Sequence, residues 1–433
     1  MARVVVVGGG FGGTAAAARL AKQGHAVTVV ERRGRLGGAV GFVERDGFRW
    51  DAGPTSTALP AVLRDLFRKS GRPLERELEL VPVEPAREHR FVDGSVLAMP
   101  TGSRSAQLEA VAAALGQGLG RQWVEHVHGY AETWDVLRRG YLERPWSPEH
   151  GGDELRKTLL TRTTLHKAVK GSLADERLRE VALLPARLDG HDPRNVPAWV
   201  GMWSYLEQNF GVWTVPGGMG ALAGLLTKRL TERRVEVLLG TTATDLRVER
   251  GRVVAVETDA GPLDADVVVV AVDPRVLPVL APHVVRTMPA MPPVVSHLGL
   301  TGEAPALPHE VVLHGDPLLV VRTNGTAPDG SAAWTVLARG RLAEDVTLAL
   351  ARRGLDVRGA LVTRVDRSPR DQAEELAGSA YGVLWQGRAT IRRKAEAAPY
   401  EGIVTAGAHA AAGAGLPFVG LSAAVAAERV GPA

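Results

Sequence analysis

The start of the chain alternates between two hydrophobic periodicities. A Val-rich run at residues 3–7 is followed by a block of glycines, an Ala-rich segment at residues 14–23 and a second apolar run at residues 26–31. Short apolar runs bounded by glycine predict buried strands, and the Ala-rich segment between them predicts a helix. The order strand, helix, strand is that of a βαβ unit, so a parallel sheet is expected at the start of the fold.

The middle of the chain predicts helices flanked by hairpins. Apolar residues recur at helical spacing over residues 105–139, and a second helix-rich block is expected at residues 153–188. The alternating segment 89–99 has Asp93-Gly94 at its centre, which predicts a hairpin. Residues 235–246 and 253–258 flank Arg250-Gly251-Arg252 and predict a second hairpin.

The second half of the chain adds strands and one uncharged stretch. Residues 265–272 form a continuous apolar run, typical of a strand buried in a parallel sheet, and residues 294–337 are rich in strand patterns. The longest uncharged stretch, residues 410–427, contains Gly413, Gly415, Pro417 and Gly420. These residues would break a membrane helix in its middle, so we expect a glycine loop followed by a short buried helix.

Composition restricts the class of protein. The 433 residues are enough for two or three domains, and 45% hydrophobic with 23% charged residues indicate a folded globular chain. A net charge of +4 without a long basic run argues against nucleic acid as a partner, and the absence of cysteine excludes thiolate chemistry. The apolar run behind Met1 is too short for a signal peptide, which predicts a cytoplasmic protein.

The glycine block carries the first chemical signal. It reads Gly8-Gly9-Gly10-Phe11-Gly12-Gly13, which contains G-x-G-x-x-G between a predicted strand and a predicted helix. Such a turn lets the backbone approach a pyrophosphate, and the helix N-terminus offers N–H groups to the anion. Glu31 ends the second strand, where an acidic side chain accepts hydrogen bonds from a ribose. A dinucleotide site is therefore predicted, but this motif alone does not distinguish NAD from FAD as the ligand.

Further motifs resemble one family. E-x-x-x-x-x-G-G at Glu31–Gly38 and D-x-G-P-T at Asp51–Thr55 are similar to the bacterial phytoene desaturases of the flavin amine oxidase superfamily. Residues 210–222, FGVWTVPGGMGAL, and residues 406–419, AGAHAAAGAGLPFV, continue the resemblance. The sequence departs from the family at Ala39, where Arg is usual, and at Ala408, where many amine oxidases carry an acidic residue.

The resemblance implies FAD as the cofactor, bound in an extended form, and a set of residues that hold it. The implied cofactor-binding residues are Gly8, Gly10, Phe11, Gly12, Gly13, Glu31, Arg32, Arg33, Arg35, Gly37, Gly38, Gly53, Pro54, Thr55, Ala243, Gly407, Ala408, Gly415, Leu416, Pro417 and Val419. The aromatic stretch before the central motif gives Tyr205, Phe210 and Trp213 as candidates for an apolar substrate pocket, and the C-terminal loop adds His409.

The fold class implied is α/β, with a discontinuous Rossmann-like FAD-binding domain and a substrate domain of mixed sheet and helices. We place the FAD-binding domain at residues 1–75, 216–280 and 395–433, and the substrate domain at residues 76–215 and 281–394. No metal site is expected, because the sequence contains no cluster of histidines with metal-ligand spacing.

The expected reaction is dehydrogenation of a hydrophobic small molecule by hydride transfer to flavin N5, with oxygen or a quinone as electron acceptor. No lysine occurs between Lys228 and Lys394, where amine oxidases usually place one near the flavin, so amine oxidation is a minority hypothesis. A redox-neutral polyene isomerase is the main alternative, and a non-catalytic prenyl-binding protein is a weaker one. Peripheral membrane contact and the oligomeric state stay open, and no catalytic residue is assigned.

Overall fold

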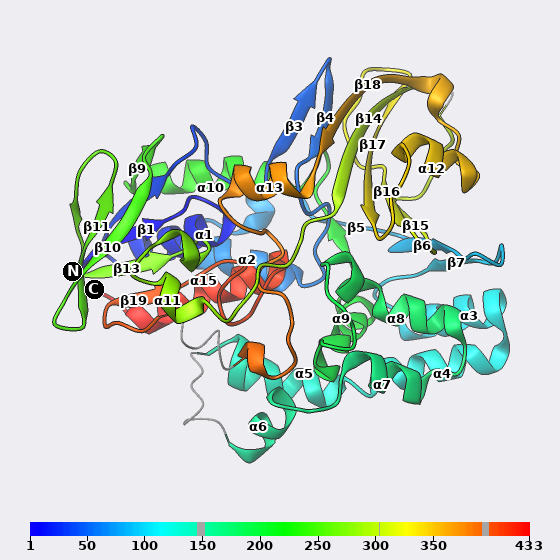
Figure 1. Cartoon of the computed structure of the whole chain (residues 1–433), viewed down its shortest axis with the longest axis horizontal. Coiled ribbons are helices and arrows are strands. Elements are labelled where there is room, and N and C mark those ends of the chain that lie inside the picture. The colour runs from blue at the N-terminus through cyan, green and yellow to red at the C-terminus, as the bar shows by residue number, and fades with distance from the viewer. Residues whose placement is uncertain (145–151, 303, 392–397) are drawn as a thin grey trace.

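The computed structural model describes residues 1–144, 152–302, 304–391 and 398–433. A five-stranded parallel sheet lies in the left half of the molecule in Figure 1, which we call the first half. Its strand order is β19-β13-β1-β2-β9, and β1 is the central strand, paired with β13 on one edge and with β2 on the other. The strands are β1 (Arg3–Val7), β2 (Ala26–Glu31), β9 (Glu236–Leu239), β13 (Val267–Val270) and β19 (Ile403–Thr405).

Alternate residues of the central strands pack into two different cores. Val4 and Val6 face a layer of helices, whereas Val5 and Val7 face a small antiparallel sheet. This alternation follows from the two-residue period of a strand, and with both faces covered every position is apolar. The helices are α1 (Phe11–Lys22), α2 (Pro60–Ser70), α10 (Ala221–Glu232) and α15 (Leu416–Val430), and the small sheet contains β10 (Ala243–Glu249), β11 (Arg252–Thr258) and β12 (Leu263–Asp264).

A seven-stranded mixed sheet lies at the upper right of Figure 1, in the half of the molecule that we call the second half. Its order is β18-β14-β17-β16-β15-β6-β7, and its pairs are antiparallel except for β15 with β6. The strands are β6 (Arg87–Arg90), β7 (Val96–Met99), β14 (Val294–Thr301), β15 (Glu310–Leu313), β16 (Leu318–Arg322), β17 (Ser331–Arg339) and β18 (Leu361–Arg367).

Helices occupy the region below this sheet in Figure 1. They are α3 (Arg104–Leu115), α4 (Gln117–His128), α5 (Ala131–Leu137), α6 (Asp153–Leu159), α7 (Leu165–Ser172), α8 (Glu176–Leu188) and α9 (Met202–Phe210). Smaller elements are β3 (Phe42–Arg45), β4 (Phe48–Asp51), β5 (Val81–Pro82), β8 (Trp213–Thr214), α11 (Ala281–Val284), α12 (Val346–Arg352) and α13 (Pro369–Leu376). The α/β fold class, with one parallel and one mixed sheet, is confirmed.

One predicted hairpin differs from the structure. The hairpin at 89–99 forms as β6 and β7, and the turn at Arg250-Gly251 joins β10 to β11 as expected. Residues 235–246, expected as one strand, are divided between β9 in the parallel sheet and β10 in the small sheet. Gly240, with φ +66°, lies between them and allows the change of direction.

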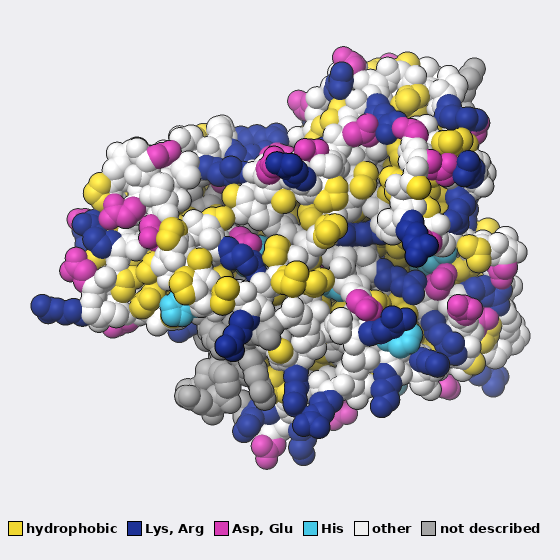
Figure 2. Space-filling view, in the orientation of Figure 1, with side chains coloured by type: hydrophobic (Ala, Val, Ile, Leu, Met, Phe, Trp, Pro, Cys, Tyr) yellow, Lys and Arg dark blue, Asp and Glu magenta, His cyan; other side chains and the backbone are white. Residues whose placement is uncertain are grey.

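The uncharged C-terminal stretch folds as a glycine loop and a helix. Helix α15 begins at Leu416, with Pro417 in its first turn, and runs for 15 residues, longer than the short helix expected. Within the described residues, none of the helices has the length and apolar character needed to cross a membrane. On the face drawn in Figure 2, basic and acidic side chains are interspersed over most of the described surface.

Candidate cofactor and substrate site

A single cavity of about 710 Å³ extends from the glycine block to the helices of the second half. Its wall includes residues from the carboxyl ends of β1 and β2, the loop before α15, helices α8 and α9, and strands β16 to β18. Ligands of open α/β sheets bind at the carboxyl ends of the strands, so this is the expected place for the dinucleotide. The volume lies within the range of roughly 300–1,000 Å³ found for ligand pockets.

The glycines of the first turn have different roles. A Cβ on Gly13 would lie 2.0 Å from the carbonyl oxygen of Gly8, so Gly13 is required by the packing of helix on strand. Gly10 differs, because the nearest atom to its Cβ would be Gly38 Cα at 3.9 Å and its φ is −69°. The space over Gly10 is therefore open to the cavity rather than filled by protein.

The three glycine-containing segments meet at this turn. Gly37 donates its N–H to the carbonyl oxygen of Gly9 at 2.8 Å, and a Cβ on Gly38 would lie 2.9 Å from Gly10 Cα. On the other side, a Cβ on Gly12 would lie 2.7 Å from Gly407 Cα. Segments separated by up to 400 residues in the chain thus form one continuous backbone surface, with N–H groups of two helix N-termini beside it.

Glu31 lies at the end of β2 and organises the turn. One carboxylate oxygen accepts the N–H of Gly9 at 2.8 Å, and the other accepts the N–H of Arg33 at 2.8 Å. Gly240 and Thr241 donate to the carbonyl oxygens of Arg33 and Glu31, which brings the segment before Ala243 alongside. A carboxylate has about four acceptor positions, so both oxygens retain capacity for ribose hydroxyls.

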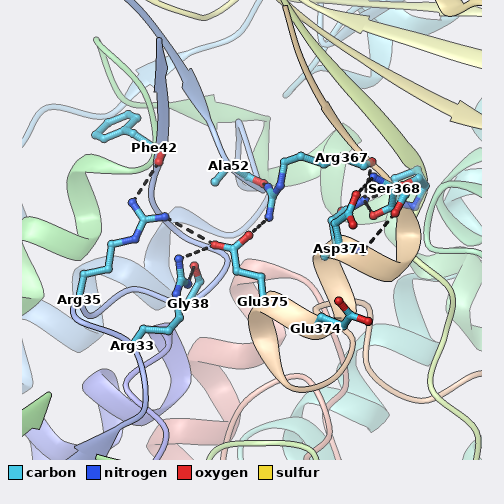
Figure 3. A network of polar contacts seen from close by, with 12 residues as sticks. Arg33, Arg35, Gly38, Phe42, Ala52, Arg367, Ser368, Asp371, Glu374 and Glu375 are labelled. Carbon is cyan, nitrogen blue, oxygen red and sulfur yellow. Dashed lines mark hydrogen bonds and ion pairs between the residues drawn. The ribbon is translucent and has the colours of Figure 1, made fainter. Parts of the chain in front are cut away.

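An arginine cluster surrounds one carboxylate at the rim of this surface (Figure 3). Glu375 of α13 forms ion pairs with Arg33 at 2.5 Å, with Arg35 at 3.6 Å and with Arg367 of β18. Arg33 also donates to the carbonyl oxygen of Gly38, and Arg367 to that of Ala52. Burial lowers the pKa of Arg33, and the charge of Glu375 opposes this effect. The cluster carries more positive than negative charge and is suited to an anionic ligand.

One part of the cavity wall is aromatic, and we call it the aromatic wall. Trp199 and Trp385 pack edge to face at 5.4 Å, and Trp203 lies 5.4 Å from Phe418 of α15. Apolar side chains of α8 and β17 continue this surface through Leu184, Leu188 and Leu337. A wall of this kind suits an apolar ligand.

Buried charges lie between the aromatic wall and the cofactor surface. Arg87 binds both oxygens of Glu207 at 2.8 and 2.9 Å and also contacts Glu310 at 2.9 Å. Glu310 in turn accepts from Arg322 at 2.8 Å. Burial would raise the pKa of Glu310, but the charges of Arg322 and Arg87 outweigh it and lower that pKa to about 2. Two arginines and two glutamates therefore form a neutral network.

Most of the predicted cofactor residues line the cavity. Those in its wall are Gly8, Gly10, Phe11, Gly12, Glu31, Arg32, Arg33, Gly37, Gly38, Gly53, Pro54, Thr55, Ala243, Gly407, Ala408, Gly415, Leu416, Pro417 and Val419. Gly13 packs beneath the turn, and Arg35 lies at the rim, where it donates to the carbonyl oxygen of Phe42. Arg32 reaches away to the last carbonyl groups of α13.

Of the four predicted substrate residues, one lines the cavity and three do not. His409 lines the cavity, where its Nε2 lies 3.2 Å from the carbonyl oxygen of Ser379. Tyr205 packs in the helical core, Phe210 is 40% exposed, and Trp213 donates to the carbonyl oxygen of Phe210; none of these three lies in the wall. Helical periodicity explains this placement, because Met202 and Trp203 occupy the cavity side of α9 and Tyr205 lies on another face.

Sequence reasoning found Glu31, Arg32 and Arg33 but missed the other charged residues of the cavity wall. Arg87, Glu310 and Arg322 lie on strands whose sequences read as ordinary alternating segments, so no local motif marks them. Glu375 and Tyr381 belong to residues 372–382, and the resemblance of this segment to the desaturase family is a signal that could have found them.

The residues present fit an extended flavin dinucleotide. The open space over Gly10, the two helix N-termini and the excess of arginine match a pyrophosphate, and Glu31 matches a ribose. In place of the arginine usual at position 39, Arg367 lies beside Ala52, on the loop where Gly53 contacts Ala39. A positive charge is thus supplied at this rim by a residue distant in sequence.

We expect the variant Glu31→Ala to bind FAD more weakly by about 1.5–3 kcal/mol, because hydrogen bonds to a charged acceptor are lost. Titration of the apoprotein with FAD, followed by flavin fluorescence, measures the change. Glu44→Ala is the control, since Glu44 is an exposed residue of β3 outside the cavity wall. Equal FAD affinity in the Glu31 variant and wild type would contradict the assignment.

Curated relatives of the chain are carotenoid enzymes. The chain is 27% identical to 4,4'-diapolycopene oxygenase of Methylomonas sp, over 72% of this chain and 66% of that protein. It is 29% identical to phytoene dehydrogenase of Streptomyces griseus, over 99% of this chain and 94% of that protein. The chain spans about half to two thirds of the length of the first relatives it matches.

Solved structures share the fold. Putrescine oxidase has a TM-score of 0.71 at 18% identity, covering 99% of this chain and 98% of that one. The family model of the flavin containing amine oxidoreductases matches residues 11–430. That match confirms FAD as the predicted cofactor, and the curated relatives confirm the phytoene desaturase-like resemblance. The chain belongs to the flavin-containing amine oxidoreductase family.

Proposed function

We propose that this protein is an FAD-dependent oxidoreductase that dehydrogenates a hydrophobic small molecule. The observation that carries the proposal is the single cavity in which the three glycine segments and the aromatic wall face the same space. A substrate held against Trp199, Trp203 and Trp385 would share that space with the cofactor. Bound FAD supplies the acceptor for a hydride from a substrate carbon.

The residues of this chain perform binding and positioning in the proposed reaction. Gly10, Gly38 and Gly407 offer backbone to the dinucleotide, Glu31 binds its ribose, and the helix N-terminus at Leu416 favours negative charge on the reduced ring. The aromatic wall orients the substrate and excludes water. The predicted cofactor residues and the domain division at 1–75, 216–280 and 395–433 are part of this proposal; the boundary at 395 falls outside the described residues.

The cavity wall favours dehydrogenation of carbon over amine oxidation. Among the described residues of the wall none is lysine, the residue type that amine oxidases usually place near the flavin. The curated relatives named as desaturases and dehydrogenases support the same choice. Because cofactor and substrate share about 710 Å³, the space left for substrate is modest, and we infer a molecule smaller than a full-length carotenoid.

Anaerobic mixing of the FAD-loaded protein with candidate compounds tests this function. A substrate is expected to bleach the visible absorbance of the flavin and to yield a product that has lost two hydrogen atoms. A product of unchanged mass would indicate the isomerase, and failure to retain any flavin would overturn the proposal. Oxygen or a quinone as acceptor, peripheral membrane contact and a cytoplasmic location stay predictions from the sequence.

A further inference from the structure

One carboxylate of the cavity wall has no role in the network described above. Asp189 follows the last turn of α8 and lines the cavity, and its side chain is partly buried. Within the described part of the chain, its carboxylate accepts no hydrogen bond and forms no ion pair. Burial raises the pKa of Asp189 to about 6, and the charges of Arg339 and Arg322 oppose the rise.

The fold gains little from an acid at this position. Asp189 stands at the C-terminal end of α8, where the helix dipole disfavours negative charge. A cation already binds this end of the helix. Arg339 donates to the carbonyl oxygen of Leu188 from Nε at 3.0 Å and from Nη2 at 2.6 Å. A partly buried carboxylate without partners costs stability, so packing does not account for Asp189.

The groups around Asp189 define what it could bind. Tyr381 lines the same cavity, burial raises its pKa, and the charge of Asp189 contributes to that rise. The guanidinium of Arg339 lies over the Tyr381 ring at 5.3 Å. Among the charges that act on Asp189 and Tyr381, Arg322 pairs with Glu310 and Arg367 pairs with Glu375, which leaves Arg339 and Asp189, whose opposite charges cancel.

We propose that Asp189 and Tyr381 anchor a hydroxyl group carried by an otherwise apolar substrate. This inference rests on the proposed function and specifies its substrate class. The carboxylate of Asp189 accepts a hydrogen bond from the substrate hydroxyl, and the phenol of Tyr381 donates one to the hydroxyl oxygen. A neutral donor fits because the local charges already cancel, whereas an ammonium group would add an unbalanced positive charge next to Arg339.

The apolar part of such a substrate has a surface to contact. Leu184 and Leu188 lie on α8, directly before Asp189, and Leu337 packs with them in one apolar cluster. Trp385 lines the same cavity. A polar anchor at one place on an apolar wall fixes orientation, which decides the C–H bond presented for oxidation.

Binding of three matched probes to the FAD-loaded protein tests the proposal. The probes are farnesol, the C15 hydrocarbon of the same skeleton without the hydroxyl, and farnesylamine. Quenching of tryptophan fluorescence reports binding, because Trp199, Trp203 and Trp385 line the cavity. We expect the wild type to bind farnesol roughly 10- to 100-fold more tightly than the hydrocarbon, as for a hydrogen bond to a charged acceptor.

Variants separate the anchor from a structural role. Asp189→Leu is expected to remove the preference for farnesol while retaining binding of the hydrocarbon. Asp189→Asn, which keeps the size but loses the charge, is expected to retain part of the preference, and Tyr381→Phe to reduce it several-fold. Both Asp189 variants should load FAD and unfold at a temperature no lower than wild type. Asp192→Asn is the control, because Asp192 is exposed and lies outside the wall.

Four results would overturn the anchor. They are equal binding of farnesol and hydrocarbon by wild type, an unchanged preference in Asp189→Leu, absence of binding by all three probes, and tighter binding of farnesylamine than of farnesol, which would indicate an amine ligand. Each of these results leaves FAD retention and flavin bleaching by other compounds unaffected, so the proposed function is judged separately.

Discussion

The variant Gly10→Val is expected to fold normally and to bind FAD about 100-fold more weakly than wild type. In the protein itself a Cβ at this position would lie 3.9 Å from its nearest atom, Gly10 lines the cavity, and φ is −69°, which valine tolerates. In the complex the same space belongs to the pyrophosphate. Overpacking costs about 1–3 kcal/mol, and because about 1.4 kcal/mol is a factor of ten, we expect affinity to fall by about 100-fold.

Two measurements give this prediction its test. The unfolding temperature of the FAD-free variant should match that of the FAD-free wild type, while FAD titration shows the loss of affinity. Gly13→Val is the matched control in the same turn: its Cβ would lie 2.0 Å from the Gly8 carbonyl oxygen, so it should yield little folded protein. A yellow, fully loaded Gly10→Val protein would mean that the dinucleotide does not approach this glycine.

The variant Arg87→Met is expected to lose about 3–5 kcal/mol of unfolding free energy at neutral pH. Arg87 is the shared partner of Glu207 and Glu310, whose side chains are 10% and 7% exposed. Removing one member of a buried ion network leaves the opposite charge without compensation, which costs more than the network contributes. Urea denaturation of wild type and variant measures the difference.

The pH dependence identifies the cause of this loss. In wild type the pKa of Glu310 is about 2, below its usual value, so its stabilising contribution is present above about pH 4.5 and is lost as the pH falls toward 2. The variant has lost part of this contribution, and the difference between the two proteins should therefore shrink as the pH is lowered from about 4.5 toward 2. A difference that stays constant would point to lost packing instead.

Arg90→Met provides a comparison on the same strand. Arg90 pairs with Glu88 at 2.7 Å, but its side chain is 31% exposed. Ion pairs with this access to solvent contribute about 0–1 kcal/mol, so Arg90→Met should change stability far less than Arg87→Met. Similar losses in both variants would show that the burial of the Arg87 network has little energetic consequence.

The amino-acid sequence alone determined the βαβ start, the glycine turn, Glu31 at the end of β2 and the buried strand at 265–272. These features are local: a turn that needs glycine or a strand buried on both faces leaves its pattern within a few residues. The flavin family was also readable, because its motifs are short and lie on single loops.

Only the tertiary structure decided how these pieces meet and what surrounds the substrate. The contacts of Gly38 and Gly407 with the first turn join distant segments. The Arg87 network and the pairing of Glu375 with Arg33 join elements that no local pattern relates, and the place of Asp189 in the cavity wall depends on the same packing. A side chain's partner across a cavity depends on the packing of whole elements, so the polarity of this cavity appears only when the chain is folded.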